Sequence, residues 1–157
     1  SAREGLKNFK NWVATEGKVY FVPVPLHSSR LRERGYNQTE KIAQALAVSC
    51  GGKVWKALAR RSFSVSQTKL SKSERVLNVA GAFVLKKRMN LSPKDLIVII
   101  DDVFTTGATT GACAYALKRN GYNNIKVCTL LFADRSNHCD RLRAFLAPRR
   151  LYLFLFL

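Results

Sequence analysis

The chain has few acidic side chains. Its 157 residues carry 10 Asp and Glu against 27 Lys and Arg, which gives a formal net charge of +17 at pH 7. The basic residues form clusters at Arg30 to Arg34, Lys56 to Arg61, Lys86 to Arg88 and Arg141 to Arg150. Each cluster alone is typical of a solvated face, but a small domain with this excess attracts polyanions. Composition therefore makes nucleic acid or a phosphate-rich ligand a serious candidate partner.

Cysteine and histidine are scarce and scattered. The cysteines are Cys50, Cys113, Cys128 and Cys139, and no two of them form a Cys-x-x-Cys pair. His138 adjoins Cys139 without a second such pair, and His27 stands alone. This spacing indicates buried thiols rather than metal ligands. We therefore expect no zinc site within these residues.

Long apolar runs are missing as well. No run reaches the ~18–20 residues that cross a bilayer, and the start shows no signal-peptide pattern. The closing run LYLFLFL, residues 151–157, predicts a last strand or a partner-facing edge. With 47% hydrophobic residues, we expect one soluble, cytoplasmic domain spanning residues 1–157.

Apolar spacing predicts alternating helices and strands. Helices are expected over 5–15, 38–50, 110–121 and 136–146, and strands over 18–26, 81–86, 96–100 and 124–134. Pro23 and Pro25 should end the first strand, and a basic loop over 27–37 should follow. Residues 60–81 form a long polar connection with one possible helical turn near 73–79. The order predicts a doubly wound α/β domain, a mainly parallel sheet flanked by helices.

The stretch LIVIIDDVFTTGATTG, residues 96–111, places two adjacent acids after an apolar run. An unbroken run of this kind predicts a parallel strand buried on both faces. Asp101 and Asp102 would lie at its carboxyl end, where open parallel sheets bind ligands. Two carboxylates that repel each other and lose water there point to a site, whereas the plainer interpretation is a solvated turn.

A loop of small residues, Thr105 to Thr110, comes directly before the next expected helix. Backbone N–H groups at such a helix start can bind a phosphate, and threonine hydroxyls add donors. The carboxylates would then face sugar hydroxyls, so the pattern predicts a phosphorylated sugar as ligand. Neither G-x-x-x-x-G-K-[ST] nor G-x-G-x-x-G occurs in the chain, which excludes the two best-known phosphate loops.

These residues resemble a known family. Four apolar residues, two acids, two spacers and TTGATT resemble the phosphoribosyl pyrophosphate (PRPP) signature of type I phosphoribosyltransferases. The stretch Phe21 to Ala47 narrows the resemblance to the competence protein F (ComF) family. So do six residues of the later connection, namely Gln67, Leu70, Arg75, Asn78, Gly81 and Phe83. The resemblance covers roughly residues 18 to 133.

The resemblance implies a phosphoribosyltransferase-like core with a small hood, and a set of roles. Asp101 and Asp102 would hold the ribose hydroxyls and through them orient Mg²⁺. The 5′-phosphate would be wrapped by Thr105, Thr106, Gly107, Ala108 and Thr109, and the pyrophosphate approached by Arg30, Arg32 and Arg34. Similar proteins are needed for DNA uptake in natural transformation, where they handle single strands in the cytoplasm. The family's amino-terminal Cys-x-x-Cys zinc module has no counterpart in these residues.

The residues after Pro25 also allow a purely physical interpretation. In an extended loop, Arg30, Arg32 and Arg34 alternate, point the same way and can meet a diphosphate. The alternative is a salt-bridged surface loop in which Glu33 pairs with one of them. Residues 36–38 are either ligands or a helix start with Asn37 as N-cap, and the sequence leaves both open.

Three functions remain open. The first is a PRPP-binding protein that handles single-stranded DNA, contacted by Arg60, Arg61, Lys69 and Lys72, with Trp55, Phe63 or Tyr36 as stacking candidates. The second is a phosphoribosyltransferase acting on a nucleobase or another small acceptor, although no nucleobase pocket is recognisable. The third is an adaptor for a DNA-translocation motor that docks on residues 151–157. The net charge favours the first.

Overall fold

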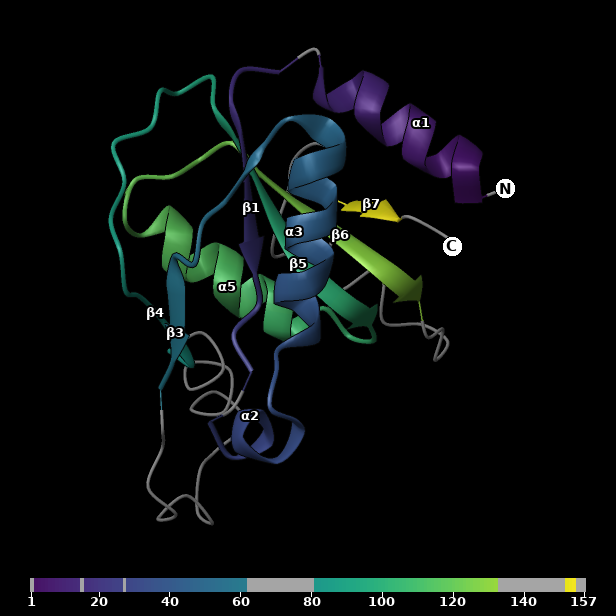
Figure 1. Cartoon of the computed structure of the whole chain (residues 1–157). Helices are drawn as coiled ribbons and strands as arrows, with labels where there is room; N and C mark the ends of the chain where they lie inside the picture. Colours follow the sequence, from purple (N-terminus) through teal and green to yellow (C-terminus); the bar gives the residue numbers. More distant parts are fainter. Residues whose placement is uncertain (1, 15, 27, 62–80, 133–151, 155–157) are drawn as a thin grey trace.

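A parallel sheet forms the centre of the protein (Figure 1). The computed structural model describes residues 2–14, 16–26, 28–61, 81–132 and 152–154. The helices are α1 (Ala2–Val13), α2 (Ser28–Arg34), α3 (Gln38–Cys50) and α5 (Ala108–Lys118). The strands are β1 (Val19–Pro23), β2 (Lys53–Val54), β3 (Leu58–Arg60), β4 (Phe83–Leu85), β5 (Leu96–Phe104), β6 (Ile125–Phe132) and β7 (Tyr152–Phe154).

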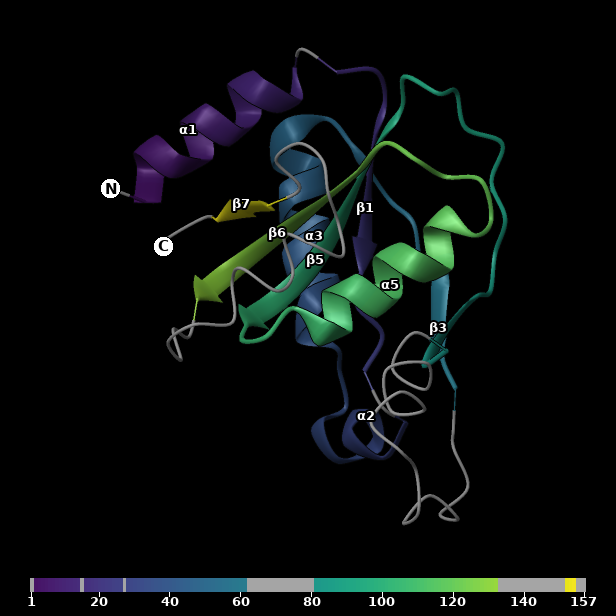
Figure 2. The ribbon, with the colours of Figure 1, turned by 180° about the vertical axis from the view of Figure 1, so that it is seen from behind.

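The main sheet has the order β2-β1-β5-β6-β7, and every neighbouring pair in it is parallel. The helices α1 and α3 lie on one face, and α5 lies on the other, as the two opposite views show (Figures 1 and 2). The strands β3 and β4 form a separate antiparallel pair. The predicted α/β class, with a mainly parallel sheet between helices, is therefore confirmed.

Strand β5 is buried on both faces, as its apolar run predicts. Leu96, Val98 and Ile100 pack in the cluster that includes residues of α1 and α3. Ile97 and Ile99 pack in the cluster that includes residues of α5. This alternation places successive side chains on opposite sides of the sheet, which decides where the following acids point.

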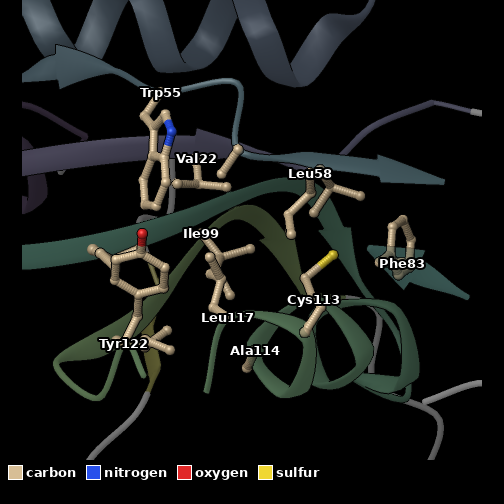
Figure 3. Close-up of a cluster of buried hydrophobic side chains, with 14 of the residues drawn as sticks. Val22, Trp55, Leu58, Phe83, Ile99, Cys113, Ala114, Leu117 and Tyr122 are labelled. Carbon is tan, nitrogen blue, oxygen red and sulfur yellow. The ribbon is translucent and has the colours of Figure 1, made fainter. Parts of the chain in front are cut away.

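The cluster between α5 and the sheet contains two packed aromatic rings (Figure 3). The rings of Trp55 and Tyr122 meet edge-on with their centroids 5.1 Å apart. The indole Nε1 of Trp55 donates to the carbonyl of Lys87 at 3.2 Å, and the Tyr122 hydroxyl donates to that of Met89 at 2.7 Å. Only 2% of Trp55 is exposed, so this ring belongs to the core and cannot stack a base.

Most expected elements are found at or near their predicted positions. The helix over 38–50 is confirmed as predicted, and the run near the carboxyl end contributes β7 at the edge of the main sheet. The short strands β2 and β3 were not predicted. The helix expected over 136–146 and the turn near 73–79 lie outside the described residues. Within the described part of the chain, no helix is long and apolar enough to cross a membrane.

Candidate functional site

The two adjacent acids belong to the last part of β5 rather than to a loop. The strand continues to Phe104, because Val103 and Phe104 pair with Leu131 and Phe132 of β6. The prediction that the strand ends at Ile100 was therefore wrong. Strand alternation puts Asp101 in series with Ile97 and Ile99, on the α5 side of the sheet, and puts Asp102 in the opposite series.

Each carboxylate is held by the backbone of the next residue. The N–H of Asp102 donates to Oδ1 of Asp101 at 3.0 Å, and the N–H of Val103 donates to Oδ1 of Asp102 at 2.8 Å. Burial, and then the negative charge of Asp102, raise the pKa of Asp101 to about 7. The hydrogen bond from the N–H of Asp102 acts in the opposite direction. Asp101 is thus poised to lose its proton when a cation or a hydroxyl donor arrives.

A threonine that the sequence analysis missed lies beside Asp101. Thr129 of β6 is the register partner of Asp101, and paired residues of parallel strands point to the same face. Thr129 is 2% exposed, and its hydroxyl has no hydrogen-bond partner among the described residues. A lone polar residue inside the apolar stretch VCTLLF was the signal that could have indicated it. The hydroxyl is a candidate donor for a ligand bound next to Asp101.

Cys113 of α5 lies near Asp101, on the same side of the sheet. It is fully buried, and the pKa of its thiol is raised by burial and by the charge of Asp101, while Arg60 acts in the opposite direction. A buried thiol with a raised pKa stays protonated and inert. The sequence-based interpretation of Cys113 as a buried thiol is therefore confirmed.

The loop of small residues leads straight into α5. Thr105 and Thr106 are exposed, and the helix begins at Ala108, two residues earlier than predicted. Gly107 is the N-cap with φ +72°, a conformation that costs other residues about 1–2 kcal/mol. Having no side chain, Gly107 supplies no cap of its own, and the hydroxyl of Thr106 accepts instead from the N–H of Ala108 at 3.3 Å. The first turn also carries no acid, so this helix start suits a phosphate.

The loop arginines do not have the expected geometry. Residues 28–34 form helix α2, in which residues two apart point to nearly opposite sides. Arg30 and Arg34 share one side, and Arg32 points away from them. The prediction that an extended loop aims all three at one diphosphate was wrong. Helix α2 does lie beyond the carboxyl end of β1, at the same edge of the sheet as the acids (Figure 1). The pyrophosphate role of the three arginines stays a prediction.

Asn37 begins a helix. Its side chain accepts from the N–H of Thr39 at 3.3 Å, and its Nδ2 donates to the carbonyl of Val24 at 3.0 Å. The hydroxyl of Thr39 donates to the same carbonyl at 2.7 Å. The alternative of Asn37 as N-cap is therefore confirmed, and the start of α3 is fixed to the end of β1.

The other basic and metal candidates are only partly described. Arg60 ends β3 with its guanidinium 5.6 Å from the Phe83 ring centroid, and Arg61 is exposed. Lys69, Lys72 and Phe63 lie outside the described residues, as do His27, His138 and Cys139. No cluster of three metal-ligating side chains occurs in the part of the chain that the structure describes. The absence of zinc stays a prediction.

Comparison with known proteins finds relatives among curated sequences, while no family model matches. The chain is 32% identical over 107 residues to "Competence protein F" of Haemophilus influenzae, covering 68% of this chain and 47% of that protein. It is 32% identical over 129 residues to "Competence protein ComFC" of Streptococcus pneumoniae, covering 80% of this chain and 55% of that protein. It is 38% identical over 112 residues to "DNA utilization protein YhgH" of Salmonella typhi, covering 69% of this chain and 47% of that protein. The chain thus spans about half the length of these relatives.

Solved structures resemble the fold at low sequence identity. An adenine phosphoribosyltransferase superposes with a TM-score of 0.60 at 12% identity, covering 98% of this chain and 76% of that one. Orotate phosphoribosyltransferase from Aeropyrum pernix superposes with a TM-score of 0.51 at 19% identity, covering 98% and 68%. The predicted type I phosphoribosyltransferase fold is therefore confirmed.

Proposed function

The chain belongs to the competence protein F family, and we propose that it binds PRPP with Mg²⁺ and handles single-stranded DNA during DNA uptake. One observation carries the proposal. A half-buried acid pair near the end of β5 leads through the three-residue loop 105–107 into a helix whose first turn carries no acid. Sugar hydroxyls and a phosphate are the groups that these two features recognise.

The residues fit a magnesium ion that is held largely by its ligand. Mg²⁺ prefers oxygen donors and is usually bound by one or two carboxylates together with substrate phosphates. Asp101 and Asp102 supply carboxylate oxygens, and no third acid or histidine completes a protein cage among the described residues. When bound, the ion would neutralise the charge of the pyrophosphate.

The side chains of the site have separate tasks in this proposal. Asp101 and Asp102 accept hydrogen bonds from the ribose hydroxyls, and the raised pKa of Asp101 falls as the cation approaches. The hydroxyl of Thr129 gains a partner in the ligand or in a water bound beside it. The first-turn N–H groups of α5, with Thr105 and Thr106, surround the 5′-phosphate.

The DNA part of the proposal has two supports. The net charge of +17 exceeds what a small phosphorylated ligand requires. The relatives bear names that refer to competence and to DNA utilization. We place this role in the cytoplasm, where single strands arrive during uptake.

Titration calorimetry with PRPP, in the presence and absence of Mg²⁺, tests the small-molecule site. The double variant Asp101→Asn with Asp102→Asn should lose Mg²⁺-dependent binding while remaining folded. Glu16→Gln is the matched control, because this carboxylate lies next to β1 at the opposite end of the sheet. Unchanged PRPP affinity in the double variant would refute the site. Pyrophosphate release in the presence of nucleobases would support the alternative, a phosphoribosyltransferase.

A further inference from the structure

An aromatic ring stands exposed at the carboxyl edge of the sheet. Tyr36 is 46% exposed, although most large apolar side chains of the described chain are buried. The ammonium group of Lys41 lies 4.0 Å from the centroid of its ring, which supports one face of the ring by a cation–π contact. Because Lys41 covers one face and nearly half of the residue is exposed, a flat partner would have to stack on the other face.

The backbone around Tyr36 is firmly anchored. Gly35, with φ +74°, ends α2 by donating its N–H to the carbonyl of Leu31 at 2.8 Å. On the other side, Asn37 and Thr39 both donate to the carbonyl of Val24. Because the chain on both sides of Tyr36 is held in place, little backbone entropy is lost when a ligand stacks on the ring.

The same hydrogen bonds connect the ring to the acid pair. The N–H of Val24 donates to the carbonyl of Ile100 at 2.9 Å, and Ile100 directly precedes Asp101 in β5. Tyr36 is therefore anchored one strand away from the candidate PRPP site. A polymer that follows the carboxyl edge could pass the ring and approach the acids.

The charges around the ring are mostly positive. The acid next to Lys41 in the chain, Glu40, is engaged in an ion pair with Lys56 at 2.6 Å. Arg30 and Arg34 of α2 are exposed and share one side of that helix, whereas Glu33 is the helix's single acid. An exposed ring among such cations is the pattern of proteins that bind single-stranded nucleic acid.

We propose that Tyr36 is a stacking platform for single-stranded DNA, with one base on the ring face opposite Lys41 and neighbouring phosphates at Arg30, Arg34 and Lys41. This inference rests on the DNA part of the proposed function. A stacking platform selects single strands, because the bases of a duplex are already stacked on one another and cannot lie on a side-chain ring.

Fluorescence anisotropy with a labelled oligothymidylate tests the platform. Tyr36→Ala should weaken binding by about 5- to 150-fold, the range seen when a stacking ring is removed, and Tyr36→Phe should bind as wild type does. Tyr115→Ala is the matched control, because Tyr115 is 43% exposed on α5, on the other face of the sheet. It should leave affinity unchanged.

Salt titrations separate stacking from charge. Tyr36→Ala removes no charge, so the dependence of affinity on salt should keep the wild-type slope. Lys41→Gln should flatten the slope by about 0.7, the value for one phosphate contact on a single strand. Lys53→Gln, an exposed cation of β2 at the opposite end of the sheet, should leave it unchanged.

The possible failures point to different causes. If wild-type protein binds the oligonucleotide and Tyr36→Ala binds it equally well, the platform is refuted and the proposed function stands. If wild-type protein binds no single-stranded DNA at low salt, the DNA part of the proposed function fails and the platform with it. Tighter binding of a duplex, or of the matching RNA strand, would likewise overturn the assignment. Retained PRPP binding by Tyr36→Ala shows that the variant is folded.

Discussion

Replacing Asp101 by Asn should stabilise the protein above pH 7. The folded state raises the pKa of Asp101 from its ordinary value of 3.8 to about 7, so the folded protein keeps a proton that the unfolded chain has released. Wild-type stability should therefore be greatest below pH 4 with respect to this group, and should fall as the pH rises to 7. The asparagine carries no charge, and this part of the pH dependence should vanish.

The magnitude follows from the same shift. At about 1.4 kcal/mol per pH unit, the full change corresponds to about 4 kcal/mol. The carboxylate of Asp101 is only partly buried, and part of its pKa shift comes from the charge of Asp102. Solvent screening therefore reduces the gain in unfolding free energy expected for Asp101→Asn to about 1–2 kcal/mol at pH 8. Asp102→Asn should give a smaller gain, because it removes only the repulsion and leaves the burial of Asp101.

Urea unfolding at pH 5 and pH 8 measures the effect. The difference in unfolding free energy between Asp101→Asn and wild type should be larger at pH 8 than at pH 5, with Glu16→Gln as control. The affinity of the wild-type protein for PRPP with Mg²⁺ should depend on pH in the opposite sense to its stability. It should fall by up to tenfold per pH unit below pH 7, as Asp101 becomes protonated. A variant less stable than wild type at pH 8 would refute the assignment of strain to the ionised Asp101.

Three further outcomes are expected. Asn37→Ala should cost about 1–2 kcal/mol and lower the melting temperature by several degrees, because it removes both the cap of α3 and a bond to Val24; an unchanged melting temperature would contradict this. Gly107→Ala should cost about 1–2 kcal/mol because of its positive φ, and should weaken PRPP binding; equal stability would show that the loop adapts. The chain should purify without stoichiometric zinc, and elemental analysis that finds about one zinc per chain after chelation would overturn that view.

Local pattern predicted much of the fold. The run Leu96–Ile100 is apolar at every position, which a strand buried on both faces requires, and it became the centre of the sheet. Helix α3 has its predicted bounds because Asn37 and Gly51 provide the cap chemistry that starts and stops a helix. Both signals act over a few residues, so the sequence alone is enough to recognise them.

Helix α2 shows where local pattern fails. The segment alternates arginine with Leu31 and Glu33, which suits an extended loop as well as a helix. Its carboxyl end is decided by the positive φ of Gly35 and by the attachment of Asn37 to Val24. With only 7 residues and no acid in its first turn, the helix carries too few local signals to be predicted.

The sequence by itself determined the chemistry of the site, namely two acids after an apolar strand and a glycine before a helix. The tertiary structure alone decided which residues join them. The register of β5 and β6 places Thr129 opposite Asp101. The hydrogen bond from Asn37 to Val24 holds the neighbouring Tyr36 at the same carboxyl edge of the sheet. Register and anchoring depend on hydrogen bonds between segments distant in the chain, and residue order does not specify those pairings.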